Sequence, residues 1–284
     1  MSGKNKIAAE APSSSLLPVP ETQLTAVKQF LDPVVKEVEV PEYMNSDPVG
    51  FMHLYPHPED QNIVGFISAL LAWGRRDIIM AKISDLLKRF GTNPADFTGN
   101  FSESDRKALT GFKHRTCNAD DMYWIIRGIS NGQNTYGSFE NFWNQCYTRN
   151  PKNLLGEFHA RFFDSIPDCP QRVRKHLSTP DKNSSCKRLC LYLRWAIRKN
   201  SCVDPGSMSF MPASELMIPL DVHVSRYARM LGLLTRRSND WKAVTELTGR
   251  LRMLDPEDPV KYDYALFGLG IHQMRVPVEL QINP

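Results

Sequence analysis

The chain has 284 residues, long enough for one large domain or two interlocked ones with a sizeable buried core. Hydrophobic residues make up 42% of it and charged residues 23%, as in ordinary soluble proteins, and no apolar run is long enough to span a bilayer. Residues 1–21 lack the continuous apolar segment of a signal peptide, and their serine and proline content predicts a disordered tail over residues 1–20. We therefore expect a cytoplasmic protein.

The periodic apolar positions predict helices throughout the chain. In chain order these helices fall near residues 63–90, 120–130, 138–147, 184–199, 222–234, 241–254 and 259–271. The run IVGFISALLAW at 63–73 predicts a buried helix, NPAD at 93 a helix start, and Pro259 a first helical residue. Alternating strand patterns are scarce. The sequence therefore predicts an all-α fold of two lobes, one over residues 21–180 and the other over 181–284.

Cysteine and histidine give no metal-binding pattern. The six cysteines contain no CxxC motif and predict reduced thiols, mostly in the core. His53 and His57 are four residues apart, but the prolines of HLYPHPED make a helical metal pair unfavourable and no third ligand is evident. We expect no metal site. The segments AWGRRD (72–77) and GFKHRT (111–116) either contact phosphates or end helices.

Positive charge is concentrated in one part of the chain. Residues 171–240 contain thirteen Lys or Arg and five acids, a net charge of +8, so the remainder carries −4. A basic stripe on a mildly acidic body is typical of proteins that neutralise phosphates. A solvated helix surface would carry the same charge.

Lys187 lies in the basic helix SSCKRLCLYLRWAIRKN at 184–200. Helical spacing places it with Arg194 and Arg198 on a face that points away from the apolar stripe. Ser184 and Ser185 are capping candidates for this helix, which puts Lys187 in the first turn. The positive end of the helix dipole there disfavours an ammonium group and attracts phosphate. At this position the side chain of Lys187 is expected to act as a nucleophilic amine. The alternative is an ordinary solvated lysine without a chemical role.

Asp221 stands directly before the next amphipathic run, in IPLDVHVSRYARMLGLL at 218–234. An aspartate at this position predicts a helix N-cap. A carboxylate held by helix N–H groups is also pre-oriented for work on a substrate, so Asp221 is either a cap alone or a cap that also acts in catalysis.

Together the two segments resemble the helix-hairpin-helix superfamily of DNA glycosylases, with a lysine early in one basic helix and a Pro-x-Asp before the next. The separation of 34 positions from Lys187 to Asp221 is longer than in the endonuclease III type. It is similar to that of the archaeal 8-oxoguanine DNA glycosylases and of a related set of bacterial proteins of unassigned function. The resemblance covers about residues 180–272. It implies a two-lobed helical glycosylase fold with a helix-hairpin-helix-like element.

The sequence departs from this superfamily in two places. The glycine-rich hairpin that precedes the lysine and holds a DNA phosphate is replaced by STPDKNSS at 178–185, which has no glycine. The four-cysteine cluster of endonuclease III is also missing, because no cysteine follows Cys202. We expect no iron–sulfur cluster and no other cofactor.

The resemblance implies roles for four residues. Lys187 would form a Schiff base with the sugar, and Asp221 would stabilise the oxocarbenium-like sugar and help to deprotonate the lysine. Asp263 and Phe267, in VKYDYALFGLG at 260–270, match the positions at which the archaeal enzymes carry an acid and an aromatic that read and stack the flipped base. A carboxylate there could accept two hydrogens from a guanine-type edge. The alternative is a first-turn acid and a core phenylalanine.

These expectations describe a bifunctional DNA glycosylase/AP lyase of base excision repair, a monomer acting on damaged DNA at 8-oxoguanine or a similar oxidised purine. The alternative is a non-catalytic helical protein that binds nucleic acid. His223 is expected to be packed or to face phosphate. The predicted contacts to the DNA backbone are Arg188, Arg194, Arg198, His223 and Arg226.

Overall fold

The structure is a computed structural model and describes residues 16–283. The all-α fold expected from the sequence is confirmed, because 66% of the chain is helical and the strands are two pairs of residues. The α-helices are α1 (Glu21–Val38), α2 (Pro58–Leu71), α3 (Arg76–Phe90), α4 (Pro94–Gly99), α5 (Ala119–Tyr136), α6 (Phe139–Arg149), α7 (Leu154–Asp164), α8 (Lys187–Ile197), α9 (Val222–Met230), α10 (Trp241–Leu254) and α11 (Tyr262–Ile271).

Short 3₁₀ segments and one small hairpin connect these helices. The 3₁₀ segments are η1 (Pro41–Asn45), η2 (Pro48–Leu54), η3 (Glu103–Leu109), η4 (Pro151–Asn153), η5 (Gln171–His176), η6 (Pro180–Lys182), η7 (Ala213–Glu215), η8 (Pro259–Lys261) and η9 (Val278–Leu280). Strands β1 (Lys113–His114) and β2 (Cys117–Asn118) pair antiparallel. No helix within residues 16–283 has the length and apolar character needed to cross a membrane.

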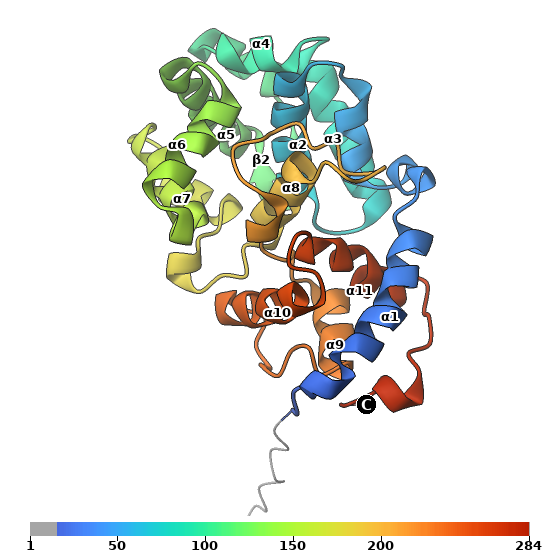
Figure 1. Ribbon diagram of the computed structural model, residues 1–284. Coiled ribbons are helices and arrows are strands. Elements are labelled where there is room, and N and C mark those ends of the chain that lie inside the picture. Colours follow the sequence, from blue (N-terminus) through green and yellow to red (C-terminus); the bar gives the residue numbers. More distant parts are fainter. Residues whose placement is uncertain (1–15, 284) are drawn as a thin grey trace, which may run out of the picture.

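The helices form two lobes (Figure 1). One lobe contains α2 to α7 with α8 packed against α2, and the other contains α1, α9, α10 and α11. The described part of the chain therefore begins and ends in the same lobe. The predicted division into segments 21–180 and 181–284 does not follow this packing. The reason is the apolar stripe of α1, which is buried against α11 so closely that a Cβ atom on Gly268 would collide with Val38.

The core of the larger lobe surrounds α2, whose residues from Asn62 to Leu71 are all buried. The Phe66 ring contacts aromatic rings from α6, α7 and α8, among them Phe139 at 5.1 Å and Tyr192 at 5.3 Å between centroids. Each such ring pair adds about 0.5–1.5 kcal/mol to the free energy of burial. The expected buried helix is confirmed over residues 63–71; it ends at Leu71, so residues 72 and 73 of the expected span lie outside it.

The expected tail is only partly within the described region, since residues 1–15 lie outside it. Residues 16–20 are extended and held against the smaller lobe. Val19 is buried and its N–H donates to the carbonyl of Gly232 at 2.8 Å. Leu17 is held as well, because its N–H donates to Asn283 Oδ1 at 2.9 Å, so the expected disorder does not extend over these residues.

Five of the six cysteines are buried and all six are free, which confirms that the thiols lie mostly in the core. Cys202 is exposed. The ring of His53 contacts the carbonyl of Val203 through Nε2 at 2.7 Å, whereas His57 is exposed. His53 therefore serves as a link between η2 and the segment after α8.

Candidate active site

Lys187 is the first residue of α8, and the chain reaches it through a left-handed turn. Cys186 occupies the N-cap position with φ 50° and ψ 28°, and no side chain caps the helix. Ser184 Oγ accepts a hydrogen bond from the N–H of Cys186 at 3.3 Å. The expectation that Ser184 or Ser185 caps α8 is therefore wrong, because the turn directs the serine hydroxyl to the residue before the helix.

Residues 183–186, which stand where the resemblance places a hairpin before α8, make their turns without glycine. Asn183 and Cys186 both have positive φ, 54° and 50°. A left-handed conformation costs a residue other than glycine about 1–2 kcal/mol, less for asparagine. Contacts to the start of α10 offset this cost: Asn183 Nδ2 donates to Asp240 Oδ2 at 3.1 Å, and the Asn183 carbonyl accepts from the N–H of Trp241 at 3.4 Å. The segments on the N-terminal side of these residues are the 3₁₀ segments η5 and η6.

Asp221 caps α9 and also contacts Lys187. Its Oδ1 accepts a hydrogen bond from the N–H of Val224 at 2.8 Å, and its Oδ2 lies 3.4 Å from Lys187 Nζ. The side chains of Lys187 and Asp221 are 37% and 10% exposed, so the amine remains accessible while the carboxylate is held in place. The helix cap and the contact with the amine use different oxygens and exist together.

A cavity of about 820 Å³ lies beside this pair, lined by residues of both lobes. Seven of the nine residues predicted as site residues line it: Lys187, Arg188, Arg194, Asp221, His223, Asp263 and Phe267. Arg198 and Arg226 are not in its wall. The structure thus brings together residues that are up to 80 positions apart in the sequence.

Asp263 reaches the cavity from the first turn of α11 and is only 5% exposed. Burial raises the pKa of this carboxyl to about 7, against the opposing effect of Arg194, whose guanidinium donates to Asp263 Oδ2. Within residues 16–283, Oδ1 has no hydrogen-bond donor. Arg194 therefore already occupies one lone pair of Oδ2, while Oδ1 is the oxygen left open to a base edge.

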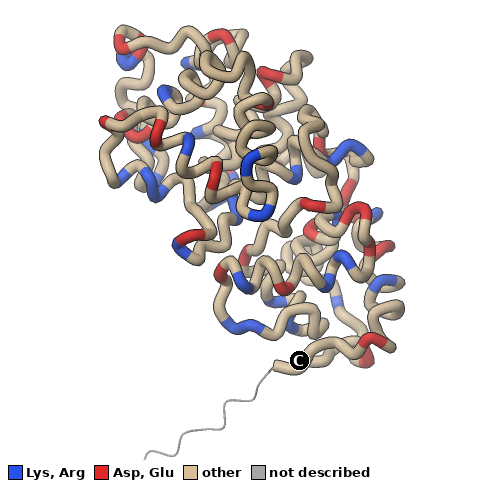
Figure 2. The backbone as a smooth tube through the Cα atoms, turned by 60° about the vertical axis from the view of Figure 1, so that its left-hand side comes forward, with Lys and Arg blue, Asp and Glu red and all other residues tan. Residues whose placement is uncertain are grey.

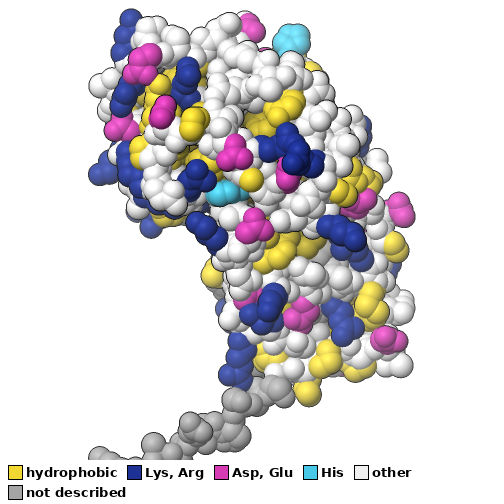
Figure 3. All heavy atoms as spheres, turned by 90° about the vertical axis from the view of Figure 1, so that its left-hand side faces the viewer, with side chains coloured by type: hydrophobic (Ala, Val, Ile, Leu, Met, Phe, Trp, Pro, Cys, Tyr) yellow, Lys and Arg dark blue, Asp and Glu magenta, His cyan; other side chains and the backbone are white. Residues whose placement is uncertain are grey.

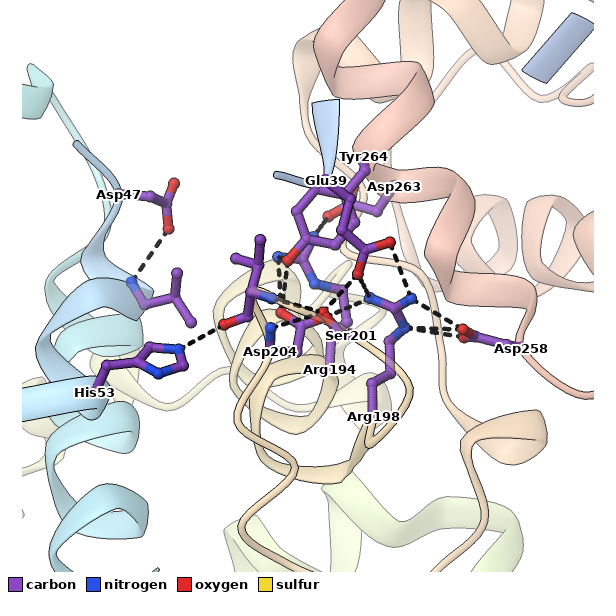
Figure 4. A network of polar contacts seen from close by, with 12 residues as sticks. Glu39, Asp47, His53, Arg194, Arg198, Ser201, Asp204, Asp258, Asp263 and Tyr264 are labelled. Atoms are coloured by element: carbon purple, nitrogen blue, oxygen red, sulfur yellow. Dashed lines mark hydrogen bonds and ion pairs between the residues drawn. The ribbon is translucent and has the colours of Figure 1, made fainter. Parts of the chain in front are cut away.

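Arg194 and Arg198 were expected to contact the DNA backbone, and this expectation is wrong. Both side chains are 2% exposed and lie in a network of buried polar groups between the lobes (Figure 4). Arg198 donates to Asp258 Oδ2 and to Glu39 Oε1, each at 2.9 Å, and Arg194 donates to the hydroxyl of Tyr264 at 3.0 Å. The two arginines therefore join α8 to the end of α1 and to α11 instead of facing solvent.

Phe267 and His223 pack against each other on one wall of the cavity. Their ring centroids are 5.8 Å apart at an interplanar angle of 89°. His223 lies so close to α11 that a Cβ on Gly270 would collide with it, which makes His223 a packed histidine. Phe267 is partly exposed, and the guanidinium carbon of Arg76 lies 5.9 Å from its ring centre.

The cavity wall also contains residues to which the sequence assigned no specific role. Trp73, Arg76 and Thr116 line the cavity, and Arg115 covers the Trp73 ring at 4.6 Å. The indole N–H of Trp73 is buried and has no acceptor among the described residues. The segments 72–77 and 111–116 therefore end helix α2, begin α3 and also form a cavity wall. In the sequence, the cavity wall was indicated here by the two arginines that follow Trp73 in AWGRRD.

Arg188 lies half-buried in the cavity wall next to Lys187. Its guanidinium donates to the backbone carbonyls of Leu70 at 2.8 Å and Lys175 at 3.4 Å. No carboxylate in the described part of the chain pairs with it, and burial lowers its pKa from the ordinary value. A partly desolvated cation without a carboxylate partner favours an anion in the cavity.

The expected basic stripe is weaker on the surface than in the sequence, because Arg194 and Arg198 are inside. Figure 2 shows Lys and Arg spread over both lobes and interspersed with Asp and Glu. On the face shown in Figure 3, basic side chains alternate with acidic and apolar ones. Arg226 is exposed on α9, with its guanidinium carbon 5.8 Å from the Tyr227 ring. Charge therefore does not mark out one large patch on this face.

Comparison with known proteins gives one match. A family model described as a protein of unknown function (DUF2400) matches residues 47–272, which is most of the chain. The matched range contains every residue that lines the cavity except Tyr43. No curated protein and no solved structure matches.

Proposed function

The chain belongs to the DUF2400 family of proteins of unknown function, and we propose that it is a bifunctional DNA glycosylase with AP lyase activity. Its proposed substrate is DNA containing 8-oxoguanine or a similar oxidised purine, in base excision repair. One observation carries the proposal: Lys187 Nζ lies 3.4 Å from Asp221 Oδ2 at the wall of a cavity that also contains Asp263 and Phe267. Binding a phosphate requires no such combination of an amine, two acids and an aromatic ring.

The cavity has the size that the reaction needs. Its volume of about 820 Å³ lies within the usual range for ligand pockets, roughly 300–1,000 Å³. An enzyme that acts on a base inside a duplex must first turn the nucleotide out of the stack into such a pocket. A flipped nucleoside in this cavity would bring its sugar close to Lys187.

The proposed reaction begins with the amine. The ammonium group of Lys187 gives a proton to Asp221, and the free amine attacks C1′ of the sugar. A bond forms between Nζ and C1′, while the bond from C1′ to the base breaks and the base leaves with the electron pair and takes up a proton. The sugar ring then opens to a Schiff base, from which loss of a proton at C2′ expels the 3′ phosphate and cuts the strand.

Once the proton taken from Lys187 has passed to the leaving base, Asp221 is a carboxylate again and would stabilise the positive charge that develops on the sugar. Its carboxylate is fixed before the substrate arrives, because the N–H of Val224 holds Oδ1. A pre-oriented carboxylate stabilises a developing cation without reorganising during the reaction.

The remaining cavity residues would hold the base and the strand. The partly exposed ring of Phe267 offers a stacking surface for the base, and Asp263 Oδ1 can accept a hydrogen from its edge. Arg188 and the first N–H groups of α8, which have no acceptor within the helix, would bind a phosphate of the strand. They would replace the glycine-rich hairpin that the sequence lacks.

The test uses duplexes that each contain one lesion: 8-oxoguanine, an oxidised pyrimidine, or an abasic site, beside an undamaged duplex. We expect the purified protein to release 8-oxoguanine and to cut the 8-oxoguanine and abasic strands, and Lys187→Gln, purified in the same way, to do neither. Binding of these duplexes without any cleavage would contradict the proposal and support the non-catalytic alternative. Equal cleavage by the variant would contradict the assignment of Lys187 as the nucleophile.

A further inference from the structure

Three side chains able to bind a metal converge next to the cavity, outside the proposed chemistry. Cys117 is the first residue of β2, Asp121 lies in the first turn of α5, and His176 ends η5. One ligand atom from each lies within 4.8 Å of the other two. All three residues are at least nine-tenths buried, at 2%, 0% and 4% exposure.

The imidazole of His176 has a buried nitrogen without a hydrogen bond. Its Nε2 lies 3.4 Å from Asp121 Oδ2, but the contact does not have hydrogen-bond geometry. Two ligands that bind Zn²⁺ at about 2.0–2.1 Å in a tetrahedral arrangement stand roughly 3.4 Å apart. The separation of these two atoms therefore fits two corners of a zinc coordination tetrahedron, and the Cys117 sulfur lies within 4.8 Å of a ligand atom of both residues.

The carboxylate of Asp121 is oriented by its neighbours. Arg172 donates to Oδ1 at 2.6 Å, and the N–H of Asn118 donates to Oδ2 at 3.1 Å. A carboxylate oxygen has two lone pairs, so Oδ2 keeps one for an ion on the side of His176. Outer contacts of this kind fix the ligands of metal sites before the ion binds.

We propose that Cys117, Asp121 and His176 bind one Zn²⁺ ion, with a water molecule as the fourth ligand. A thiolate, an imidazole and a carboxylate in a tetrahedral arrangement suit Zn²⁺ better than Mg²⁺ or Ca²⁺, which prefer oxygen ligands. Binding displaces the thiol proton of Cys117 to solvent, so the ion would face a thiolate and a carboxylate that also pairs with Arg172. This site departs from the sequence expectation of no metal.

The ion would join two separate parts of the cavity wall. Thr116 and His176 both line the cavity, one from the β-hairpin and the other from the segment that leads to α8. Zinc would therefore fix the position of the chain that precedes Lys187. The proposal does not depend on the glycosylase activity, because it rests on the ligands alone.

The test measures zinc bound to the chelator-treated protein after equilibrium dialysis at micromolar free Zn²⁺. We expect one equivalent per chain in the wild type, and at least about tenfold weaker binding in Cys117→Ser and His176→Gln, because each loses a ligand. Cys146→Ser is the matched control, since Cys146 is also a buried free thiol but lies outside the cluster. It should bind as the wild type does.

Cobalt provides a second readout. Co²⁺ bound to the wild type and to Cys146→Ser should show thiolate-to-metal charge-transfer absorption, which Cys117→Ser should lack. Zinc should also raise the midpoint of thermal unfolding of the wild type and not of Cys117→Ser. Less than one equivalent of zinc in the wild type, or unchanged binding and absorption in Cys117→Ser, would overturn the proposal.

Discussion

The guanidinium of Arg194 on α8 donates to Asp263 Oδ2 on α11, inside the protein. This contact ties the helix that begins with Lys187 to the helix that carries the proposed base-binding residues. Arg194 also lies 3.4 Å from Asp204, which is fully buried. The arginine therefore neutralises buried carboxylates and cannot reach a DNA strand.

Replacing Arg194 should destabilise the whole protein. Arg194→Met leaves buried carboxylates without their partner, and the loss of one member of a buried ion pair costs about 3–5 kcal/mol. Arg226→Met, at an exposed position of α9, should change the free energy of unfolding by about 0.5 kcal/mol or less. Urea denaturation followed by circular dichroism measures both. Equal stability of the two variants would show that the Arg194 pair contributes nothing to folding.

Asp263 should give the protein a pH-dependent stability. Burial raises the pKa of Asp263 from 3.8 to about 7, so the folded protein binds a proton that the unfolded chain releases between these values. The contribution of this group to the free energy of unfolding therefore falls as the pH rises through the window and is constant above it. From about pH 5 to about pH 8, wild type should lose stability relative to Asp263→Asn. Urea denaturation at several pH values tests this, and a pH-independent difference would contradict it.

The sequence predicted which residues line the cavity better than it predicted which helices make up each lobe. Lys187 and Asp221 could be located because each stands at a helix start, which local patterns encode, whereas the roles of Asp263 and Phe267 were expected from the resemblance to the archaeal enzymes. Helix α1 was missed because Pro33 interrupts its apolar period, although the helix continues through it.

The errors at Arg194 and Arg198 have a different cause. Both residues follow helical spacing on the charged face of α8, which predicts exposure. Their partners Asp263 and Glu39 are 69 and 159 positions away, and no local pattern indicates that such distant acids converge on one helix. For the same reason the sequence did not predict that Trp73 and Arg115 meet at the cavity wall.

Asp221 allows its capping role to be separated from its proposed chemical role. Asparagine is as good an N-cap as aspartate, so Asp221→Asn should change the free energy of unfolding little, while Asp221→Ala should cost about 1 kcal/mol. Both variants should release the base roughly 10²-fold more slowly, because neither has a carboxylate beside Lys187. Thermal unfolding and single-turnover base release measure the two effects. Wild-type turnover in Asp221→Asn would reduce Asp221 to a helix cap.

Phe267 and Asp263 should contribute differently to base recognition. Phe267→Ala should lose about 1–3 kcal/mol of transition-state binding through lost stacking, with little effect on which base is chosen. Asp263→Asn should reduce the preference for 8-oxoguanine over an oxidised pyrimidine, because the amide presents a donor as well as an acceptor to the base edge. Single-turnover excision of both lesions compares the variants. A wild-type preference for the pyrimidine, or an Asp263→Asn variant as selective as wild type, would refute the purine assignment.

The most direct test of the central claim is borohydride trapping of the covalent adduct between the protein and a DNA strand that contains 8-oxoguanine. Reduction converts a Schiff base to a stable amine, so the adduct marks the attacking lysine. Lys175→Gln is the matched control, since Lys175 also lines the cavity but does not contact Asp221. We predict adduct with the wild type and with Lys175→Gln and none with Lys187→Gln; adduct formation by Lys187→Gln at the wild-type level, or no adduct with the wild type, would contradict the assignment of Lys187 as the nucleophile.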